Sequence, residues 1–198
     1  MPAQAVRCGL MRILCCLLPL SFAAAPALGE VVQSLEVKTY NVSYRSDMSL
    51  REAITAVSPI RHGGKTFHGF TRWHVNWQIW WNTTPEGRCQ IHKTQTRVNG
   101  IITLPVLQQG APVEVRQTFD RYVTALRRHE MGHYQFGQDA ASQIDRQILA
   151  LTPQATCTLL ELTANSIGRR ILEDAIREEI EYDRRTRHGR TEGVTLTP

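Results

Sequence analysis

The sequence lacks a run of about 20 apolar residues, the length that a membrane-spanning helix requires. Its most apolar stretch, Ile13 to Leu20, is too short for that purpose. It also has no internal repeat, no low-complexity linker and no basic run with interleaved aromatic residues. These absences argue against a membrane anchor, a repeat protein and a nucleic-acid-binding protein. The formal net charge of +5 is mild and fits an ordinary solvated surface.

Cysteine is scarce, and no two cysteines have the CxxC spacing of a cysteine zinc site. Cys8, Cys15 and Cys16 lie near the N-terminus, which leaves Cys89 and Cys157 in the rest of the chain. In an oxidising compartment these two would form one disulfide, and the alternative is a pair of free thiols.

The first 29 residues have the layout of a secretory signal peptide. Arg7 and Arg12 form a basic start, an apolar run follows, and small residues come next. Ala27 and Gly29 occupy the −3 and −1 positions of a plausible cleavage site before Glu30. We therefore expect residues 1–29 to direct export, which predicts a periplasmic or secreted protein without stable membrane insertion after signal removal.

The remaining chain, residues 30–198, has the length and composition of a single globular domain. Its first part is rich in strand patterns. Thr39 to Tyr44 favours a short strand, and Phe67 to Trp81 alternates as expected for a strand with one buried face. Cys89 to Leu104 predicts one or two further strands, with a turn near Asn99-Gly100.

Helical patterns surround and follow these strands. Ser49 and Glu52 form a capping box that predicts a short helix. The apolar period changes to 3.6 over residues 115–149 and again over residues 158–184, which predicts two long antiparallel helices. The fold class expected is α+β, with an N-terminal antiparallel sheet and a short helix packed on the two long C-terminal helices.

The first long helix carries an HExxH motif, His129-Glu130-Met131-Gly132-His133. Residues four apart lie one turn apart on one face, so His129 and His133 can bind one Zn²⁺. Glu130 would act as the general base for a water molecule. All three fall on or beside the apolar stripe, where a buried carboxylate is costly unless a metal compensates for it. Gly132 costs about 1 kcal/mol in a helix interior, which indicates a close neighbour.

A catalytic zinc needs a third protein ligand. The residues alone leave several candidates: His62, His68, His74, His92, His188 and acidic residues of the last helix. Asp183 continues an inward helical face, and a simple helical hairpin would bring Asp174 and Glu178 near the motif.

The chain resembles the bacterial family known as predicted secreted zinc-dependent proteases, domain of unknown function 922. The resemblance covers about residues 40–193. It rests on Gly69-Phe70-Thr71-Arg72-Trp73, on Ile102-Thr103-Leu104-Pro105, on Arg128 with the HExxH motif, on the two cysteines and on a tail containing Tyr182, Asp183, Thr186 and His188-Gly189.

The resemblance implies a zincin-like secreted metallopeptidase with one Zn²⁺, and it makes His188 the preferred third ligand. Asp183 ranks second, as ligand or as the acceptor that orients a ligand imidazole, and Glu178 ranks third. Tyr182 would either donate to an oxyanion or pack in the core. We expect a peptide or protein substrate. A metal-stabilised envelope module without turnover and a cell-wall amidase are the alternatives.

Overall fold

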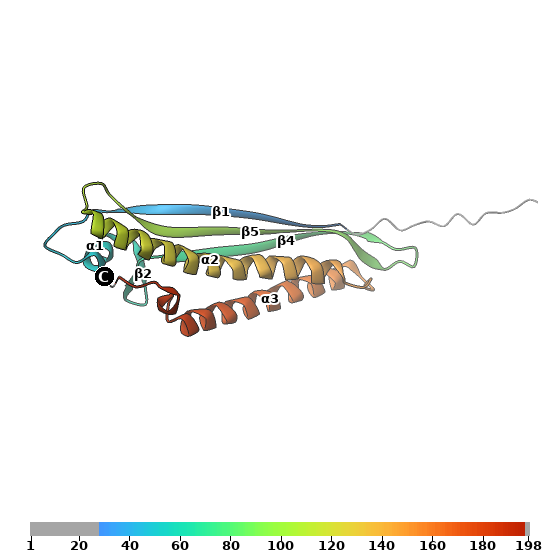
Figure 1. Ribbon diagram of the computed structural model, residues 1–198. Helices are drawn as coiled ribbons and strands as arrows, with labels where there is room; N and C mark the ends of the chain where they lie inside the picture. The colour runs from blue at the N-terminus through green and yellow to red at the C-terminus, as the bar shows by residue number, and fades with distance from the viewer. Residues whose placement is uncertain (1–27, 197–198) are drawn as a thin grey trace, which may run out of the picture.

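The structure is a computed structural model that describes residues 28–196, so the predicted signal segment up to residue 27 lies outside the described residues. Its elements follow the chain as β1 (Leu28–Val42), α1 (Leu50–Val57), β2 (Ile60–His62), β3 (Lys65–Phe67), β4 (Phe70–Thr83), β5 (Cys89–Leu107), α2 (Val113–Leu149), α3 (Cys157–Thr186) and the 3-10 helix η1 (Arg190–Glu192). Three long strands lie over two long helices, and α1 and the β2–β3 hairpin gather at one end (Figure 1). The α+β prediction is confirmed.

The main sheet is mixed, with the order β1-β5-β4. β4 and β5 are antiparallel, as expected for a hairpin, but β1 pairs with β5 in parallel, so the expectation of a wholly antiparallel sheet is wrong. The chain reverses direction through α1 and the β2–β3 hairpin before entering β4. β5 then returns along the same direction as β1 and takes the central position between the other two strands.

The predicted turn at Asn99-Gly100 is wrong, because β5 continues through both residues. Gly100 pairs with Leu35 on one side and Trp73 on the other. A side chain at Gly100 would collide with the ring of Tyr134 on α2, so the glycine allows a close approach of helix and sheet.

β1 is longer than the strand expected over residues 39–44. Its first part is mostly exposed and lacks the alternation of a half-buried strand.

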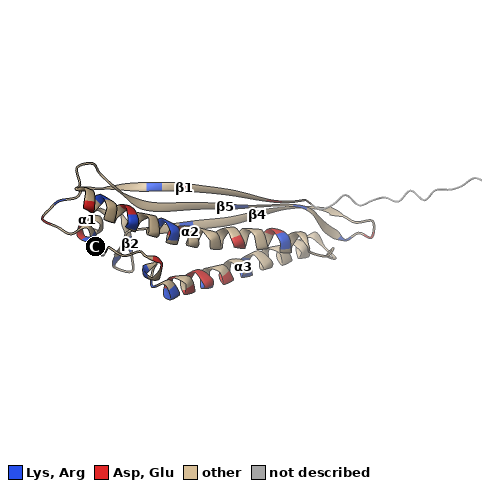
Figure 2. Ribbon diagram, in the orientation of Figure 1, with Lys and Arg blue, Asp and Glu red and all other residues tan. Residues whose placement is uncertain are grey.

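One face of the sheet is covered by helices and the other is open. In β4, Thr71, Trp73, Val75 and Trp77 point toward the helices and the residues between them are exposed. The main core combines inner-face strand residues with the inward faces of α2 and α3; its fully buried members include Val98, Ile144, Ile148, Leu160 and Ala164. The charged residues in the second half of α3 are mostly acidic, with Arg177, Arg184 and Arg185 among them (Figure 2).

The two long helices match the expected ranges to within two residues at each end. α1 begins at Ser49 with the predicted capping box, in which the Ser49 side chain and Glu52 satisfy each other's backbone N–H groups. It packs in a second core with β5 and the first turns of α2; this core includes Val42, Ile54, Phe119 and Leu126. The residues after η1 return to this second core, where Val194 and Leu196 pack against it.

Cys89 and Cys157 form the expected disulfide, with their Cα atoms 5.1 Å apart. The bond joins the start of β5 to the start of α3. Reciprocal backbone hydrogen bonds between Cys89 and Gln154 support the same connection. No helix in the described part of the chain is long and apolar enough to cross a membrane.

Candidate metal centre

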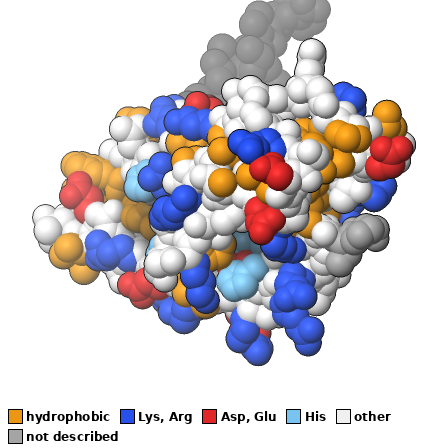
Figure 3. Space-filling model, turned by 90° about the vertical axis from the view of Figure 1, so that its left-hand side faces the viewer, with side chains coloured by type: hydrophobic (Ala, Val, Ile, Leu, Met, Phe, Trp, Pro, Cys, Tyr) orange, Lys and Arg blue, Asp and Glu red, His pale blue; other side chains and the backbone are white. Residues whose placement is uncertain are grey.

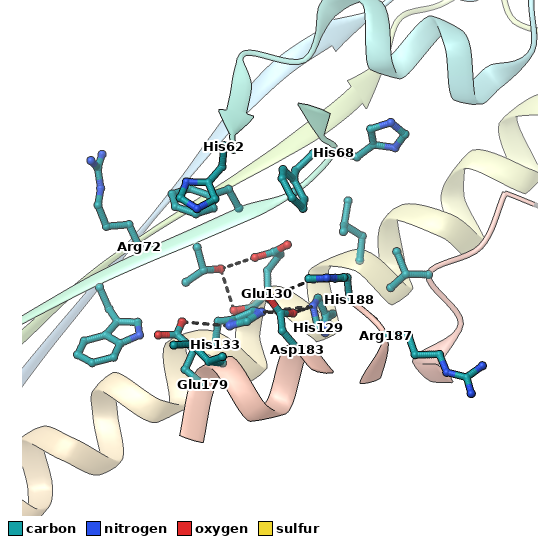
Figure 4. A pocket seen from close by; sticks show the side chains of 18 of the residues that line it. His62, His68, Arg72, His129, Glu130, His133, Glu179, Asp183, Arg187 and His188 are labelled. Atoms are coloured by element: carbon teal, nitrogen blue, oxygen red, sulfur yellow. Dashed lines mark hydrogen bonds and ion pairs between the residues drawn. The ribbon is translucent and has the colours of Figure 1, made fainter. Parts of the chain in front are cut away.

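Three side chains from α2 and α3 converge on one point. The Nε2 atoms of His129 and His133 lie 3.3 Å apart, and Asp183 Oδ1 lies 3.2 Å from each of them. Ligands at about 2.0–2.1 Å from a tetrahedral zinc are separated from one another by about 3.3 Å. The triangle of His129, His133 and Asp183 therefore has the dimensions of one face of a zinc coordination sphere (Figure 4).

The outer nitrogen of each imidazole is held by a carboxylate. His129 Nδ1 lies 2.9 Å from Glu192 Oε2, and His133 Nδ1 lies 3.0 Å from Glu179 Oε1. An ionised carboxylate can only accept a hydrogen bond, so each Nδ1 carries a proton, and in the neutral imidazole each Nε2 presents a lone pair. Carboxylates placed in this way are the usual partners of metal-binding histidines.

The three facing atoms are therefore all electron-pair donors. Two Nε2 lone pairs and a carboxylate oxygen lie in contact distance of one another, and they can remain so only with a cation between them. Without a metal that cation is a proton, and the pKa values agree. Burial lowers the pKa of His133, but the hydrogen bonds with Asp183 and Glu179 outweigh it and raise the pKa to about 10.

The pKa of His129 is also raised, because Asp183 and Glu192 outweigh the effect of burial. Asp183 shows the complementary shift. Burial would raise its pKa, but the two imidazoles beside it hold the pKa well below the usual range. The site thus binds positive charge strongly in its metal-free form.

Glu130 is 5% exposed and lies against the start of β4. Thr71 Oγ1 donates to Glu130 Oε2 at 2.7 Å and is 2.9 Å from the Glu130 carbonyl oxygen. The other carboxylate oxygen faces Gly69, where an added Cβ would be only 2.6 Å away. Burial raises the pKa of Glu130, although the Thr71 hydrogen bond acts in the opposite direction. A carboxylate with a raised pKa is suited to accept a proton near neutral pH.

The structure ranks the candidates for the third ligand differently from the sequence. Asp183 belongs to the group that could hold a metal, whereas His188 is 66% exposed and contacts Asp183 from outside, with Nδ1 3.2 Å from Oδ2. Glu178 is exposed, and its neighbour Glu179 turns toward His133 instead. The geometry favours Asp183 as the ligand and His188 as its neighbour.

The other candidate histidines lie elsewhere. His68 is fixed on both sides, with Nδ1 2.7 Å from Tyr122 Oη and Nε2 2.9 Å from Thr55 Oγ1, and burial lowers its pKa to about 4. His62 and His74 are exposed side chains that line the cleft above the site. His92 is exposed on β5. Within the described residues, none of these four joins the three-residue group.

Tyr182 explains the glycine inside the motif helix. Its ring stacks on His129, with centroids 5.1 Å apart, and covers Gly132, where an added Cβ would be 2.5 Å from the tyrosine oxygen. The hydroxyl donates to Glu192 at 3.0–3.1 Å. Tyr182 is not among the described residues that line the cleft. Its contacts give it a positioning role, in which it holds Glu192 against His129.

The turn after α3 brings Glu192 to the site. Arg187 and His188 both have φ near 52°, and Gly189 has φ of 77°, so the chain folds back sharply. Gly189 approaches His129 so closely that a Cβ would be 2.9 Å from the imidazole Cγ. This position therefore needs glycine both for its backbone conformation and for its lack of a side chain.

The metal-capable group lies at the base of an open cleft of about 890 Å³. The cleft is bounded by β4, by the β2–β3 hairpin, by the second half of α3 and by the turn that follows it. The group offers three protein side chains beside an open cleft, whereas a structural zinc site is closed by four ligands.

Sequence reasoning missed three residues that the structure places around this group: Thr71, Glu179 and Glu192. Thr71 belongs to the buried face of the alternating strand and could have been found there. Glu179 stands four residues before Asp183 and so shares its helical face. Glu192 follows the last helix and has no periodic signal.

The fold and the three converging side chains define an α+β protein with a two-histidine, one-carboxylate group able to hold a metal. Residues 37–189 match the model of a family described as bacterial protein of unknown function (DUF922), and the chain belongs to that family. No curated protein and no solved structure matches the chain.

Proposed function

We propose that the protein is an exported zinc-dependent hydrolase that cleaves peptide bonds, with Glu130 as the general base. The observation that carries the proposal is the 3.2–3.3 Å triangle formed by His129 Nε2, His133 Nε2 and Asp183 Oδ1. Two imidazole nitrogens and a carboxylate oxygen are a ligand set that suits Zn²⁺. Three protein ligands beside an open cleft leave a coordination position for water or substrate.

A zinc ion held there would act as a Lewis acid, making water a stronger acid and polarising a carbonyl oxygen. The chain supplies the proton transfer. Glu130 Oε2 is occupied by the Thr71 hydroxyl, so Oε1 is the oxygen that can accept a proton from an attacking water molecule. After protonation, the same oxygen can deliver that proton to a leaving amine.

Hydrogen bonds from neighbouring side chains fix the orientation of Glu130 and of the two histidines. Thr71 bonds both the carboxylate and the carbonyl oxygen of Glu130, which fixes its side chain relative to the helix. Glu179 and Glu192 fix the ring planes of His133 and His129. Such support typically changes metal affinity or activity 10–100-fold when it is removed.

The buried position of Glu130 favours an enzyme over a metal-stabilised binding module. A binding module in which zinc is purely structural needs metal ligands, but it does not need an additional buried carboxylate beside them. Here a fourth acidic side chain lies one residue from a ligand and bonds only to Thr71 among the described side chains. Keeping it there costs free energy, which a catalytic role would explain.

The test is the substitution Glu130→Gln in the full chain, assayed for zinc content and for cleavage of a mixed peptide library by mass spectrometry. We expect the variant to keep one zinc per chain and to lose at least about 100-fold in cleavage rate, the usual contribution of a general base. Wild-type protein with one zinc and no cleavage of any peptide would contradict the peptidase proposal. Release of free peptides from the glycan strands of cell-wall material would then identify an amidase.

A further inference from the structure

One wall of the cleft is an apolar row on α3. Leu172, Ile176 and Ile180 follow one another at four-residue spacing and all line the cleft, ending one turn before Asp183. Ile176 is 48% exposed and Ile180 is 65% exposed. Isoleucine side chains this exposed, aligned beside a candidate metal centre, form a surface that an apolar ligand group would cover.

The opposite end of the cleft is basic. Arg51 on α1 and Arg187 and Arg190 in the turn after α3 line it there, and Arg72 lines it from β4. Figure 3 looks onto this end of the molecule and shows Lys and Arg side chains gathered around a histidine. All four arginines are exposed.

These arginines have no acidic partner within the described part of the chain. Other arginines are paired, as Arg45 is with Asp47 and Arg184 is with Glu181. Within residues 28–196, the guanidinium groups of the four cleft arginines make no ion pair and no hydrogen bond, and Arg51 accepts one bond from Thr55 only at its backbone carbonyl. The carboxylates that line the cleft are Glu130, Glu179 and Asp183, and each is already bonded at the metal-capable group.

We infer that the substrate is a peptide with an apolar side chain beside the cleaved bond and acidic side chains further along, and that the apolar group lies on the α3 row while the acidic groups face Arg51, Arg187 and Arg190. The inference rests on the proposed function, since it describes the substrate of the same site. Unpaired arginines in a cleft raise the local concentration of anions and pair with carboxylates once water is displaced.

The apolar row separates a peptide from other anionic ligands. A polyanion without apolar groups would use the arginines and leave the isoleucines exposed. A neutral apolar peptide would use the isoleucines and gain nothing from the arginines. On the last part of the chain, the apolar row precedes Asp183 on α3, and Arg187 and Arg190 follow it. An extended ligand that crosses the metal-capable group can therefore contact both surfaces.

The experiment measures binding rather than turnover. Zinc-loaded Glu130→Gln full chain is titrated with three fluorescein-labelled peptides by anisotropy at low salt: leucine followed by glutamates, leucine followed by lysines, and serine followed by glutamates. We expect the first peptide to bind at least about tenfold more tightly than either other, since one buried apolar side chain alone contributes about 10-fold or more. Its advantage over the lysine peptide should shrink as salt is raised.

Two pairs of variants assign the effect to the two surfaces. The double charge reversal Arg51→Glu with Arg190→Glu should reverse the preference between the glutamate and lysine peptides. Arg121→Glu is the control, since Arg121 is an exposed arginine of α2 that does not line the cleft. Ile180→Ser should abolish the preference for leucine over serine, whereas Leu162→Ser, which changes a 59% exposed residue on the same helix, should not.

Equal binding of the three peptides would overturn the inference. So would control variants that change the peptide preferences as much as the cleft variants do. Inorganic polyphosphate that binds as tightly as the leucine–glutamate peptide would also overturn it, because the apolar row would then contribute nothing. Failure of the proposed function has a different signature. It would appear as absent zinc or absent cleavage in the wild-type protein, whatever the peptide preference of the variant.

Discussion

His129 and His133 present their Nε2 atoms to each other at 3.3 Å, while their Nδ1 atoms face away from each other onto Glu192 and Glu179. This orientation follows from two contacts that lie outside the HExxH motif. A helix alone fixes only the spacing of the two side chains, whereas the outer carboxylates fix which nitrogen faces inward. The outer carboxylates therefore give the first prediction.

Glu192→Gln and Glu179→Gln should each weaken zinc binding by about 10–100-fold without unfolding the protein. An amide can donate as well as accept, so it no longer enforces a proton on Nδ1. Zinc affinity is measured by competition with a chromogenic chelator. Glu178→Gln is the matched control, since Glu178 is the exposed neighbour of Glu179. Equal affinities for all three variants and the wild type would refute the orienting role.

Zinc binding should depend on pH, with the affinity rising as the pH rises. In the metal-free protein the pKa of His133 is raised to about 10, so at pH 7 the imidazole carries a proton that zinc must displace. The apparent affinity should increase by about tenfold per pH unit from neutral pH up to that value and then level off. Calorimetry in buffers of different ionisation enthalpy would show proton release, and a pH-independent affinity would contradict the account.

The stability of the metal-free protein should depend on pH through the same histidine. Because the folded pKa of His133 lies above its ordinary value of 6.5, the proton on this imidazole stabilises the folded state below that value. The contribution should be lost as the pH rises toward 10. The measurement is the free energy of urea unfolding at pH 6 and pH 10 in chelator. His133→Gln should show a smaller loss over this interval than the wild type.

Gly132→Ala should destabilise the protein although alanine is the better helix former. The new methyl group would lie 2.5 Å from Tyr182 Oη, so the ring must move and Glu192 with it. Overpacking of this kind typically costs about 1–3 kcal/mol. In a Tyr182→Leu background the same change should cost less or even stabilise, which thermal unfolding of the four proteins would test as a double-mutant cycle.

Removing the disulfide should lower stability and leave the metal-capable group intact. Closing a loop between residues separated by 68 positions is worth about 4 kcal/mol in the chain-entropy description. Cys157 lies at the start of α3 and Asp183 near its end, about 39 Å apart along the helix axis. We expect Cys89→Ser with Cys157→Ser to unfold at lower urea concentration but to bind zinc with unchanged affinity. A parallel loss of zinc would show that the two ends of α3 are coupled.

Local sequence patterns predicted most of the helices and strands, because each pattern involves residues only a few positions apart. The capping box at Ser49, the alternation in β4 and the apolar stripes of α2 and α3 each depend on neighbours within a few positions. The order of the strands in the sheet depends instead on contacts between residues far apart in the sequence. Nothing in the spacing of β1 indicates that it pairs in parallel with β5, and the turn signal at Asn99-Gly100 instead serves the packing of Tyr134.

In the site, too, residues that are close in the sequence were predicted, and residues brought together by long-range packing were not. His129, Glu130 and His133 share one helix, so their spacing was sufficient. The third ligand depends on how α3 packs against α2. The sequence ranked Asp183 second after His188, whereas the structure places Asp183 at the metal-capable group and His188 outside it. Glu192 depends on three successive residues with positive φ, and no periodic pattern predicts such a turn.

The most direct test of the account is the zinc content of purified full-length protein, measured by mass spectrometry for wild type, Asp183→Asn and His188→Ala. We predict one zinc per chain in the wild type and in His188→Ala, and loss of most of the zinc in Asp183→Asn. Full zinc in Asp183→Asn with loss in His188→Ala would contradict the ligand set drawn from the structure. Absence of any bound metal in folded wild-type protein would contradict the metal centre itself.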